Sequence, residues 1–234
     1  MLEKLKEEVC RANIELKTSG LVIYTWGNVS AIDRDSGLLV IKPSGVPYDK
    51  LKAADMIVLD LEGNIVEGKL RPSSDTPTHI ELYKAYKDVG AVVHTHSTFA
   101  TAWAQSGRDL PVYGTTHADY FATEIPCTRN LTDGEVFGEY EKNTGLCIIE
   151  EFAKRSIKPS DTPAVLCKNH GPFTFGKDAS NAVYNSVVLE EIAKMAAITL
   201  EINRIAEPAT EAVRRKHYER KHGKNAYYGQ EGDS

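Results

Sequence analysis

The sequence predicts a single α/β domain. Stretches with a helical period and stretches typical of buried strands alternate along all 234 residues, and no linker, repeat or low-complexity tract interrupts them. Apolar residues make up 41% of the chain and charged residues 26%, an ordinary balance for a domain with a full core. This length fits one large domain or two small ones, and length alone does not decide between them.

The first third of the chain predicts two helices with strands between them. Residues 2–17 carry apolar side chains at helical spacing, and Gly20 follows them as a stop. Thr76 before Pro77 is typical of a helix N-terminus, and this helix is expected to reach about Lys87. Three strand-like runs, separated by turn-forming residues, lie between these helices: Leu21–Thr25, Leu38–Lys42 and Met56–Leu61.

The rest of the chain continues the alternation. A strand ending at His96 precedes a helix expected over Ser97–Ser106, and residues 110–129 are expected to be irregular with short strands. A helix is expected near 131–155, broken around Asn143–Gly145. The remaining elements are expected as strands at Ala164–Lys168 and Phe173–Gly176, a long helix from Asp178 to about Asn203, and a basic helix over about 208–222.

Charge and cysteine content exclude several classes of protein. The net charge of -5 argues against a nucleic-acid-binding protein, because the only basic block is Arg214–Lys224. No apolar run reaches the length of a membrane span, and the charged start is unlike a signal peptide. None of the four cysteines forms a Cys-x-x-Cys pair, so neither a disulfide scaffold nor a thiolate zinc site is indicated. We expect a cytoplasmic protein.

The most informative stretch is Val92-Val93-His94-Thr95-His96. Side chains alternate along a strand, so His94 and His96 are expected to point to the same side. Two imidazoles on a rigid edge form half of a metal site. With Asp75 upstream and His170 downstream, they would hold a zinc-like ion.

Each of these residues also has an ordinary structural interpretation. Asp75 precedes Thr76 and could be a helix cap. His170 precedes Gly171-Pro172 and could be a turn residue. The spacing alone leaves both interpretations open.

Small polar residues cluster where strands are expected to end. Hydroxyls and closely approaching backbone N–H groups suit a phosphate dianion, although ordinary turns have the same composition. The clusters are Gly27-Asn28, Ser44-Gly45 and Ser73-Ser74. Neither a P-loop nor a dinucleotide-binding fingerprint occurs.

Longer motifs give a specific resemblance over residues 25 to 230. These motifs are Thr25-Trp-Gly-Asn-Val-Ser-Ala31, Ile41-Lys-Pro-Ser-Gly-Val46, Arg71-Pro-Ser-Ser-Asp-Thr-Pro-Thr-His79, Val93-His-Thr-His-Ser97, Gly114-Thr-Thr-His-Ala-Asp-Tyr120, Ile125-Pro-Cys-Thr-Arg129, His170-Gly-Pro-Phe173 and a C-terminal stretch from Lys216 to Gln230. Together they resemble the L-ribulose-5-phosphate 4-epimerase family of the class II aldolase and epimerase superfamily, which also includes L-fuculose-phosphate aldolase. Aldolases of this group typically carry Glu where this chain has Asp75, so Asp75 favours an epimerase.

The resemblance implies a fold and an assembly. It implies one three-layer α/β/α domain over residues 1–230, with a central, mainly antiparallel sheet. It also implies a ring-like homotetramer with active sites at subunit interfaces. Residues 231–234, Glu231–Ser234, extend past the usual end and are expected to be a disordered tail.

The resemblance also implies roles for individual residues. The metal-ligand positions, for Zn²⁺ with Mn²⁺ or Co²⁺ as alternatives, are Asp75, His94, His96 and His170. The substrate-phosphate positions are Gly27, Asn28, Ser44, Gly45, Ser73 and Ser74. The acid–base positions are Asp119 and Tyr228, with His217 and Thr115 as weaker candidates.

We therefore expect a metal-dependent epimerase that interconverts L-ribulose 5-phosphate and D-xylulose 5-phosphate, in arabinose or ascorbate breakdown. A second hypothesis is an aldolase that releases its aldehyde product. A third is a non-catalytic zinc-binding or scaffold protein, which would leave the polar clusters and Asp119 without a role.

Overall fold

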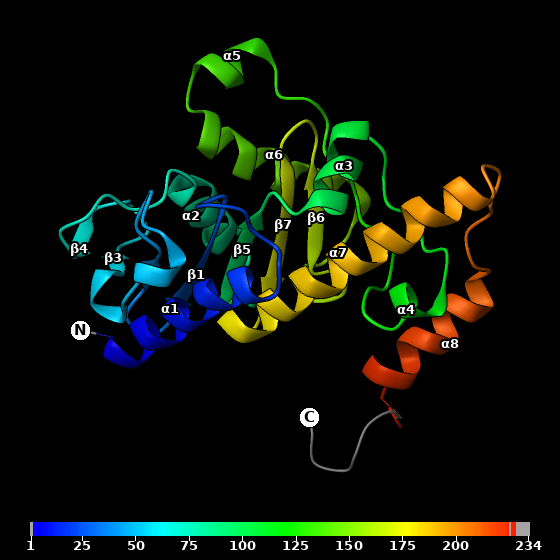
Figure 1. Ribbon diagram of the computed structural model, residues 1–234, viewed down its shortest axis with the longest axis horizontal. Helices are drawn as coiled ribbons and strands as arrows, with labels where there is room; N and C mark the ends of the chain where they lie inside the picture. Colours follow the sequence, from blue (N-terminus) through cyan, green and yellow to red (C-terminus); the bar gives the residue numbers. More distant parts are fainter. Residues whose placement is uncertain (1, 225, 228–234) are drawn as a thin grey trace.

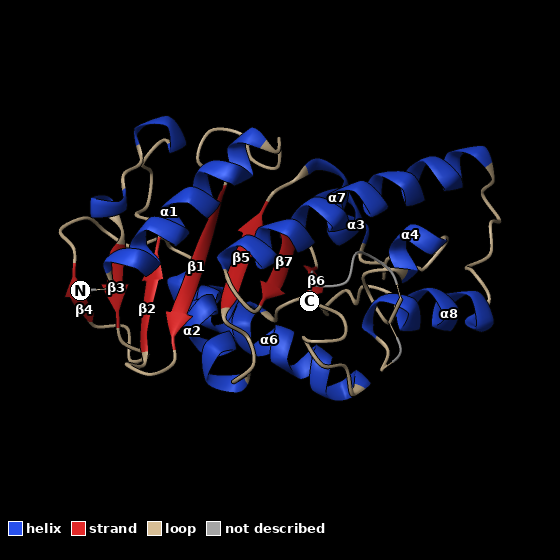
Figure 2. Ribbon diagram, turned by 90° about the horizontal axis from the view of Figure 1, so that it is seen from below, coloured by secondary structure: helices blue, strands red, loops and turns tan. Residues whose placement is uncertain are grey.

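The computed structural model describes residues 2–224 and 226–227. Within these residues, helices cover both faces of one seven-stranded sheet, so the molecule has three layers (Figures 1 and 2). The strand order is β4-β3-β2-β1-β5-β7-β6, and every neighbouring pair is antiparallel. The predicted α/β domain with a mainly antiparallel central sheet is confirmed.

The elements have the following bounds. The strands are β1 (Gly27–Asp33), β2 (Leu38–Ile41), β3 (Ile57–Leu59), β4 (Ile65–Glu67), β5 (Ala91–Thr95), β6 (Ala164–Cys167) and β7 (Gly171–Gly176). The helices are α1 (Glu3–Thr18), α2 (Thr76–Ala85), α3 (Thr98–Ser106), α4 (Thr115–Ala118), α5 (Asp133–Phe137), α6 (Tyr140–Arg155), α7 (Ala179–Ile202) and α8 (Glu211–His222), with short 3₁₀ turns at Tyr48–Lys50 and Ala53–Asp55.

Two apolar layers hold the helices to the sheet. On one face, α1 and α7 pack against β1 and β5 through residues such as Val9, Leu16 and Val183. On the other face, α2 and α6 pack against the sheet through residues such as Leu82 and Phe152. Every residue of β5 is buried, because β5 lies inside the sheet with helices on both faces. The strand that carries His94 is therefore a rigid support.

Three predicted boundaries are wrong. Leu21–Thr25 is a turn rather than a strand; Tyr24 has a left-handed φ of 54°, and the strand begins at Gly27. The helix near 131–155 is interrupted around Gly138, between α5 and α6, and not at 143–145. Gly145 lies inside α6, where a Cβ would come within 3.0 Å of Glu81 and Thr78 on α2, so it permits close helix packing. Thr76 is the first residue of α2 rather than its cap, a position that Asp75 occupies.

One end of the sheet brings distant parts of the chain together. The C-terminal end of β5 lies between the start of β1 and the start of β7, with Asn28 opposite His94 on one side and Phe173 on the other. Glycine is required on both sides: a Cβ on Gly27 would come 2.8 Å from the His94 carbonyl oxygen, and one on Gly171 would come 2.7 Å from that of Thr95. This end holds the candidate site.

Helix α8 lies away from the sheet and packs against α4 (Figure 1). In the part of the chain that is described, no helix combines the length and apolar character needed to cross a membrane.

Candidate active site

Three histidines converge at this end of the sheet. His94 lies on β5, His96 is the first residue after β5, and His170 lies in the turn between β6 and β7. One ligand nitrogen from each lies within 4.8 Å of the other two, and His94 Nε2 is 3.1 Å from His96 Nε2. The alternation of strand side chains thus brings His94 and His96 to one point, and the β6–β7 turn adds the third imidazole.

Hydrogen bonding and burial prepare these imidazoles for a metal ion. Burial lowers the pKa of each of the three, most strongly for His94, so they are neutral near pH 7. His94 Nδ1 lies 3.0 Å from the Pro172 carbonyl oxygen and donates to it, which leaves the Nε2 lone pair directed at His96. Neutral imidazole nitrogens are ligands for divalent cations, and one nitrogen from each of the three rings lies close enough to share one ion. The three histidines therefore fit a metal ion.

Asp75 lies beside this cluster but is not part of its tightest group. It occupies the N-cap position of α2, yet its side chain makes no capping hydrogen bond. Its Oδ2 instead accepts from Asn28 Nδ2 at 2.6 Å. Burial alone would raise the pKa of Asp75, but nearby His94 and His79, with the Asn28 bond, hold it below its usual value. An ionised carboxylate at this place supports an interpretation as a ligand rather than a helix cap.

A cavity of about 550 Å³ joins the histidines to the polar loops. All ten residues expected at metal and phosphate positions line it: Gly27, Asn28, Ser44, Gly45, Ser73, Ser74, Asp75, His94, His96 and His170. The two serine loops are tied together, because Ser44 N–H donates to the Arg71 carbonyl at 2.9 Å and Ser73 N–H donates to that of Lys42 at 3.0 Å. The polar clusters thus form one wall of a single site.

Lys42 is a site residue that the sequence reasoning missed. It lines the cavity although it is only 2% exposed, and burial lowers its pKa to about 8. Its Nζ donates to the Pro43 carbonyl at 3.1 Å and lies 5.0 Å from the centre of the Tyr48 ring. A lysine that lines the same cavity as the three serines suits a bound anion. Its position directly before Pro43-Ser44, at the end of an apolar strand, is the signal that could have identified it.

Tyr140 is a second such residue. It lines the same cavity, and its hydroxyl is 3.5 Å from His170 Nδ1. No pattern around Tyr140 in the sequence distinguishes it from an ordinary helix residue.

Asp119 does not line the cavity of its own chain. It follows α4, where both of its oxygens accept from Arg220 on α8, at 2.9 and 2.6 Å, and His217 Nδ1 lies 3.0 Å away. Burial raises the pKa of Asp119, but the bonds from Arg220 and His217 outweigh that effect and lower it. Asp119 is therefore ionised near pH 7. Tyr228 and Glu231–Ser234 lie outside the described residues.

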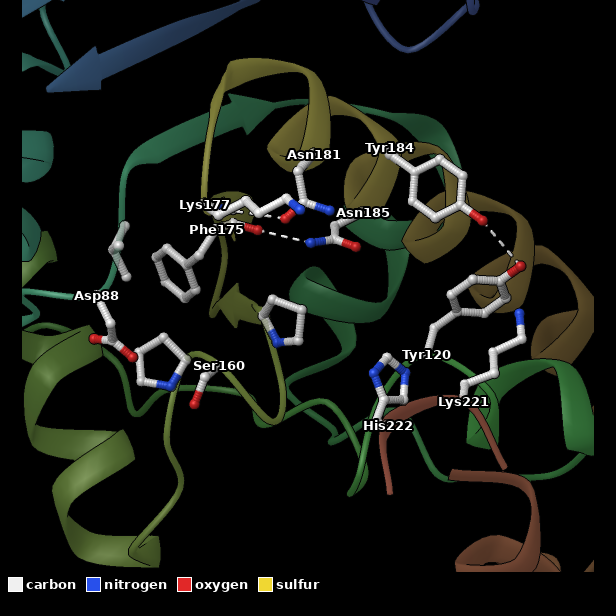
Figure 3. A pocket seen from close by; sticks show the side chains of 14 residues that line it. Asp88, Tyr120, Ser160, Phe175, Lys177, Asn181, Tyr184, Asn185, Lys221 and His222 are labelled. Atoms are coloured by element: carbon white, nitrogen blue, oxygen red, sulfur yellow. Dashed lines mark hydrogen bonds between the residues drawn. The ribbon is translucent and has the colours of Figure 1, made fainter. Parts of the chain in front are cut away.

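A different cavity, of about 420 Å³, opens near the other end of β7 (Figure 3). Several of its polar groups are hydrogen-bonded to other residues that line it. The Tyr184 hydroxyl donates to the Tyr120 hydroxyl at 3.0 Å, and Asn185 Nδ2 donates to the Phe175 carbonyl at 2.8 Å. Lys221 Nζ lies 3.9 Å from the centre of the Tyr120 ring. The convergent histidines lie in the cavity with the serine loops, which makes that one the candidate active site.

Comparison with known proteins agrees with this geometry. Residues 7–197 match the class II aldolase and adducin N-terminal domain. Among solved structures, the chain is similar to an L-fuculose 1-phosphate aldolase, with 26% identity over 93% of this chain and 95% of that chain, and a TM-score of 0.78. It is also similar to YgbL of Klebsiella pneumoniae, with 25% identity over 92% and 99% of the two chains and a TM-score of 0.71. The matched region includes the cavity and the three histidines, and the chain belongs to the class II aldolase and adducin N-terminal domain family.

Proposed function

We propose that this protein is a metal-dependent L-ribulose-5-phosphate 4-epimerase. One observation carries the proposal: a single cavity contains three neutral imidazoles, a carboxylate, polar loops suited to binding a phosphate and a buried lysine. Such a cavity suits a phosphorylated sugar whose carbonyl end lies near a metal ion. The substrate and product would be L-ribulose 5-phosphate and D-xylulose 5-phosphate, in arabinose or ascorbate breakdown, and sugar phosphates of this kind suit a cytoplasmic enzyme.

The chemistry of the substrate determines the route. C4 of a 2-ketopentose 5-phosphate has no acidic proton, because the carbonyl is at C2. A base takes the C4 hydroxyl proton, and C4 becomes an aldehyde carbon as the C3–C4 bond breaks. The electrons of that bond pass into the C2 carbonyl, which gives the enediolate of dihydroxyacetone and glycolaldehyde phosphate. Rotation of the aldehyde and re-addition on its other face inverts C4. Cleavage is a retro-aldol step, and re-addition, with an acid returning a proton to the C4 oxygen, is an aldol step. Both bond changes fit the similarity to an aldolase.

Each group of cavity residues has a role in this route. His94, His96 and His170, with Asp75, would hold Zn²⁺, or Mn²⁺ or Co²⁺, which supplies Lewis acidity to the negative charge that develops on C2 and C3 oxygens. The serine loops and Lys42 hold the phosphate and so keep the cleaved aldehyde in the site. Retaining the aldehyde is what separates an epimerase from an aldolase.

The acid and base would come from a second copy of the chain. Asp119 directly follows α4 and does not line the cavity of its own chain, so a role in catalysis requires a neighbouring subunit. The loop before β1 supports this arrangement: Trp26 lines the cavity, and Ile23, Tyr24 and Trp26 are all exposed. Exposed apolar groups at the mouth of a site suit a contact between subunits. We infer a homotetramer in which Asp119 and Tyr228 provide the two proton-transfer faces.

A sugar-phosphate aldolase is the second candidate. It is favoured by the similarity to an L-fuculose 1-phosphate aldolase at 26% identity. Asp75 favours the epimerase, because aldolases of this group typically carry Glu at the corresponding position.

Analysis of products separates the two candidates. Zn²⁺-loaded protein incubated with L-ribulose 5-phosphate should give D-xylulose 5-phosphate with little free glycolaldehyde phosphate, as measured by chiral chromatography. Stoichiometric release of free aldehyde would favour the aldolase. No reaction with any ketose phosphate would leave the non-catalytic zinc protein as the better interpretation.

The phosphate cradle leads to a prediction about binding. Ser74→Ala should raise KM roughly 10- to 100-fold, because a hydrogen bond to a charged group contributes about 1.5–3 kcal/mol, and Ser44→Ala should act similarly. Their effect on kcat should be small, since the phosphate is bound equally in ground and transition states. Lys42→Met should raise KM further, because it removes a full charge.

Steady-state kinetics test this prediction, with Ser36→Ala in the exposed β1–β2 turn as the matched control. A large fall in kcat with unchanged KM in the cradle variants would show that these residues act in the chemical step instead.

A further inference from the structure

A buried hydrogen-bonded chain runs behind the candidate metal centre. Tyr83 OH lies 2.7 Å from Ser30 Oγ, which lies 2.6 Å from His79 Nδ1. Tyr83 and His79 come from α2 and Ser30 comes from β1, and all three side chains are fully buried. None of them lines the cavity, so substrate binding does not explain them.

The direction of this chain can be deduced from its members. A buried tyrosine hydroxyl must give its proton to an acceptor, and among described side chains Ser30 Oγ is the partner within reach. The Ser30 hydroxyl then donates a hydrogen bond to His79 Nδ1. The opposite direction would leave the Tyr83 proton buried without an acceptor, at a cost of about 1–3 kcal/mol. Burial lowers the pKa of His79 to about 4, so the ring is neutral, and its single proton is on Nε2.

That Nε2–H is a buried donor with no partner among the described residues. His79 lies one helical turn after Asp75, and its backbone N–H donates to the Asp75 carbonyl at 3.2 Å, so the two side chains share one face of α2. Side chains four residues apart are neighbours on a helix surface, which places the His79 ring beside the Asp75 carboxylate. Asn28, which already donates to Asp75 Oδ2, also has a buried Oδ1 without a described partner. Unfilled hydrogen-bonding groups therefore flank the Asp75 carboxylate.

His79 also contacts the histidine cluster through an aromatic ring. Its ring meets Phe173 edge to face, with centroids 6.1 Å apart, and Phe173 stacks on His94 at 4.3 Å. A change at His79 can therefore reach the metal centre by two routes, the carboxylate and the ring stack.

We propose that His79 is a positioning residue for the metal centre, whose Nε2–H donates to the Asp75 carboxylate when a divalent cation binds among the three histidines. This inference rests on the metal centre of the proposed function. Asn28 and His79 together would direct the remaining lone pairs of Asp75 at the cation. Outer-shell partners of this kind typically change metal affinity 10- to 100-fold when they are removed.

The test compares Zn²⁺ affinities, measured by competition with a chromophoric chelator, with the melting temperatures of the metal-free proteins. His79→Leu removes the donor and fills similar space, and it should weaken Zn²⁺ binding roughly 10- to 100-fold. His79→Gln retains an amide N–H on a side chain of similar reach and should recover most of this affinity. The Ser30→Ala variant cannot donate to His79 Nδ1, so it no longer fixes the tautomer of His79. Its loss of Zn²⁺ affinity should be intermediate.

Tyr83→Phe is the matched control. It removes a buried hydroxyl from the same chain but leaves Ser30 able to donate to His79, so Zn²⁺ affinity should stay within about twofold of wild type even where the melting temperature falls. This variant separates a general loss of stability from a loss of the Nε2–H donor.

Three outcomes would overturn the inference. One is wild-type Zn²⁺ affinity in folded His79→Leu. Another is a His79→Gln variant that binds no better than His79→Leu, which would assign the effect to packing. If His79→Leu does not fold, Ser30→Ala decides, and wild-type affinity there overturns the proposal. Failure of the wild-type protein to bind Zn²⁺ would instead overturn the metal centre itself, and this inference with it.

Discussion

Replacing His96 with asparagine should lower Zn²⁺ affinity by roughly 100- to 1,000-fold and lower turnover with it. Protein zinc sites bind with about 10–16 kcal/mol, so one of four ligands contributes about 2.5–4 kcal/mol. His96 is the best ligand to replace, because it is the exposed member of the cluster, whereas His94 is buried and stacked on Phe173. The loss should therefore come from the metal centre and not from the core.

Metal content by elemental analysis, measured beside activity, checks this result. The melting temperature of the metal-free variant is the control, and it should match that of metal-free wild type. Full activity of His96→Asn in a chelating buffer would show that no metal held by these histidines takes part in turnover.

The sequence was sufficient to place those helices and strands that have a signal within their own residues. The helices α1, α2, α3 and α7 and the strands β2, β3 and β5 lie near their predicted places. Helix α1 has an apolar pattern of helical period, whereas Pro77 and Asp178 indicate where α2 and α7 begin. Strand β4 was missed: it has three residues, two of them exposed, and exists through pairing with β3. Leu21–Thr25 has the composition of a strand, but the close approach of Gly27 to β5 places the strand later.

The sequence predicted residues of the candidate site only where the residue type itself indicates a role, such as a histidine that can bind a metal ion. His94 and His96 show strand alternation, and His170 and Asp75 could be added only as candidates from distant parts of the chain. Lys42 and His79 were missed because their importance depends on burial, which no local pattern displays for a polar residue. Asp119 lies away from the cavity, where Arg220 and His217 hold its carboxylate, and no local sequence pattern predicts those contacts across about 100 residues.

If inversion proceeds through cleavage of C3–C4, the protein should act as a slow aldolase in the absence of any pentulose. Given dihydroxyacetone and glycolaldehyde phosphate, the Zn²⁺-loaded enzyme should form both L-ribulose 5-phosphate and D-xylulose 5-phosphate. Both epimers are expected because re-addition can take place on either face of the aldehyde. Carbon isotope effects at C3 and C4 should accompany epimerisation if cleavage limits the rate.

Two variants should separate the proton-transfer faces of this reaction. Asp119→Asn removes an ionised carboxylate, and Tyr228→Phe removes a hydroxyl, so each should slow epimerisation at least about 100-fold. Zn²⁺ content should be normal in both, since neither residue is a proposed ligand. Asp35→Asn, at an exposed carboxylate in the β1–β2 turn, is the control for a simple change of charge.

The pair of variants is informative because Asp119 also has a structural role. Its bonds to Arg220 and His217 join α4 to α8, so Asp119→Asn could loosen that contact as well as remove a proton-transfer group. Arg220→Lys weakens the same contact while keeping the Asp119 carboxylate and a positive charge, and it should slow the enzyme much less if the carboxylate itself transfers protons. Equal losses in Arg220→Lys and Asp119→Asn would assign Asp119 to the α4–α8 contact. Near-normal rates in Asp119→Asn and Tyr228→Phe, with no pentulose phosphate formed from the two fragments, would overturn the cleavage route while leaving the fold and the metal centre in place.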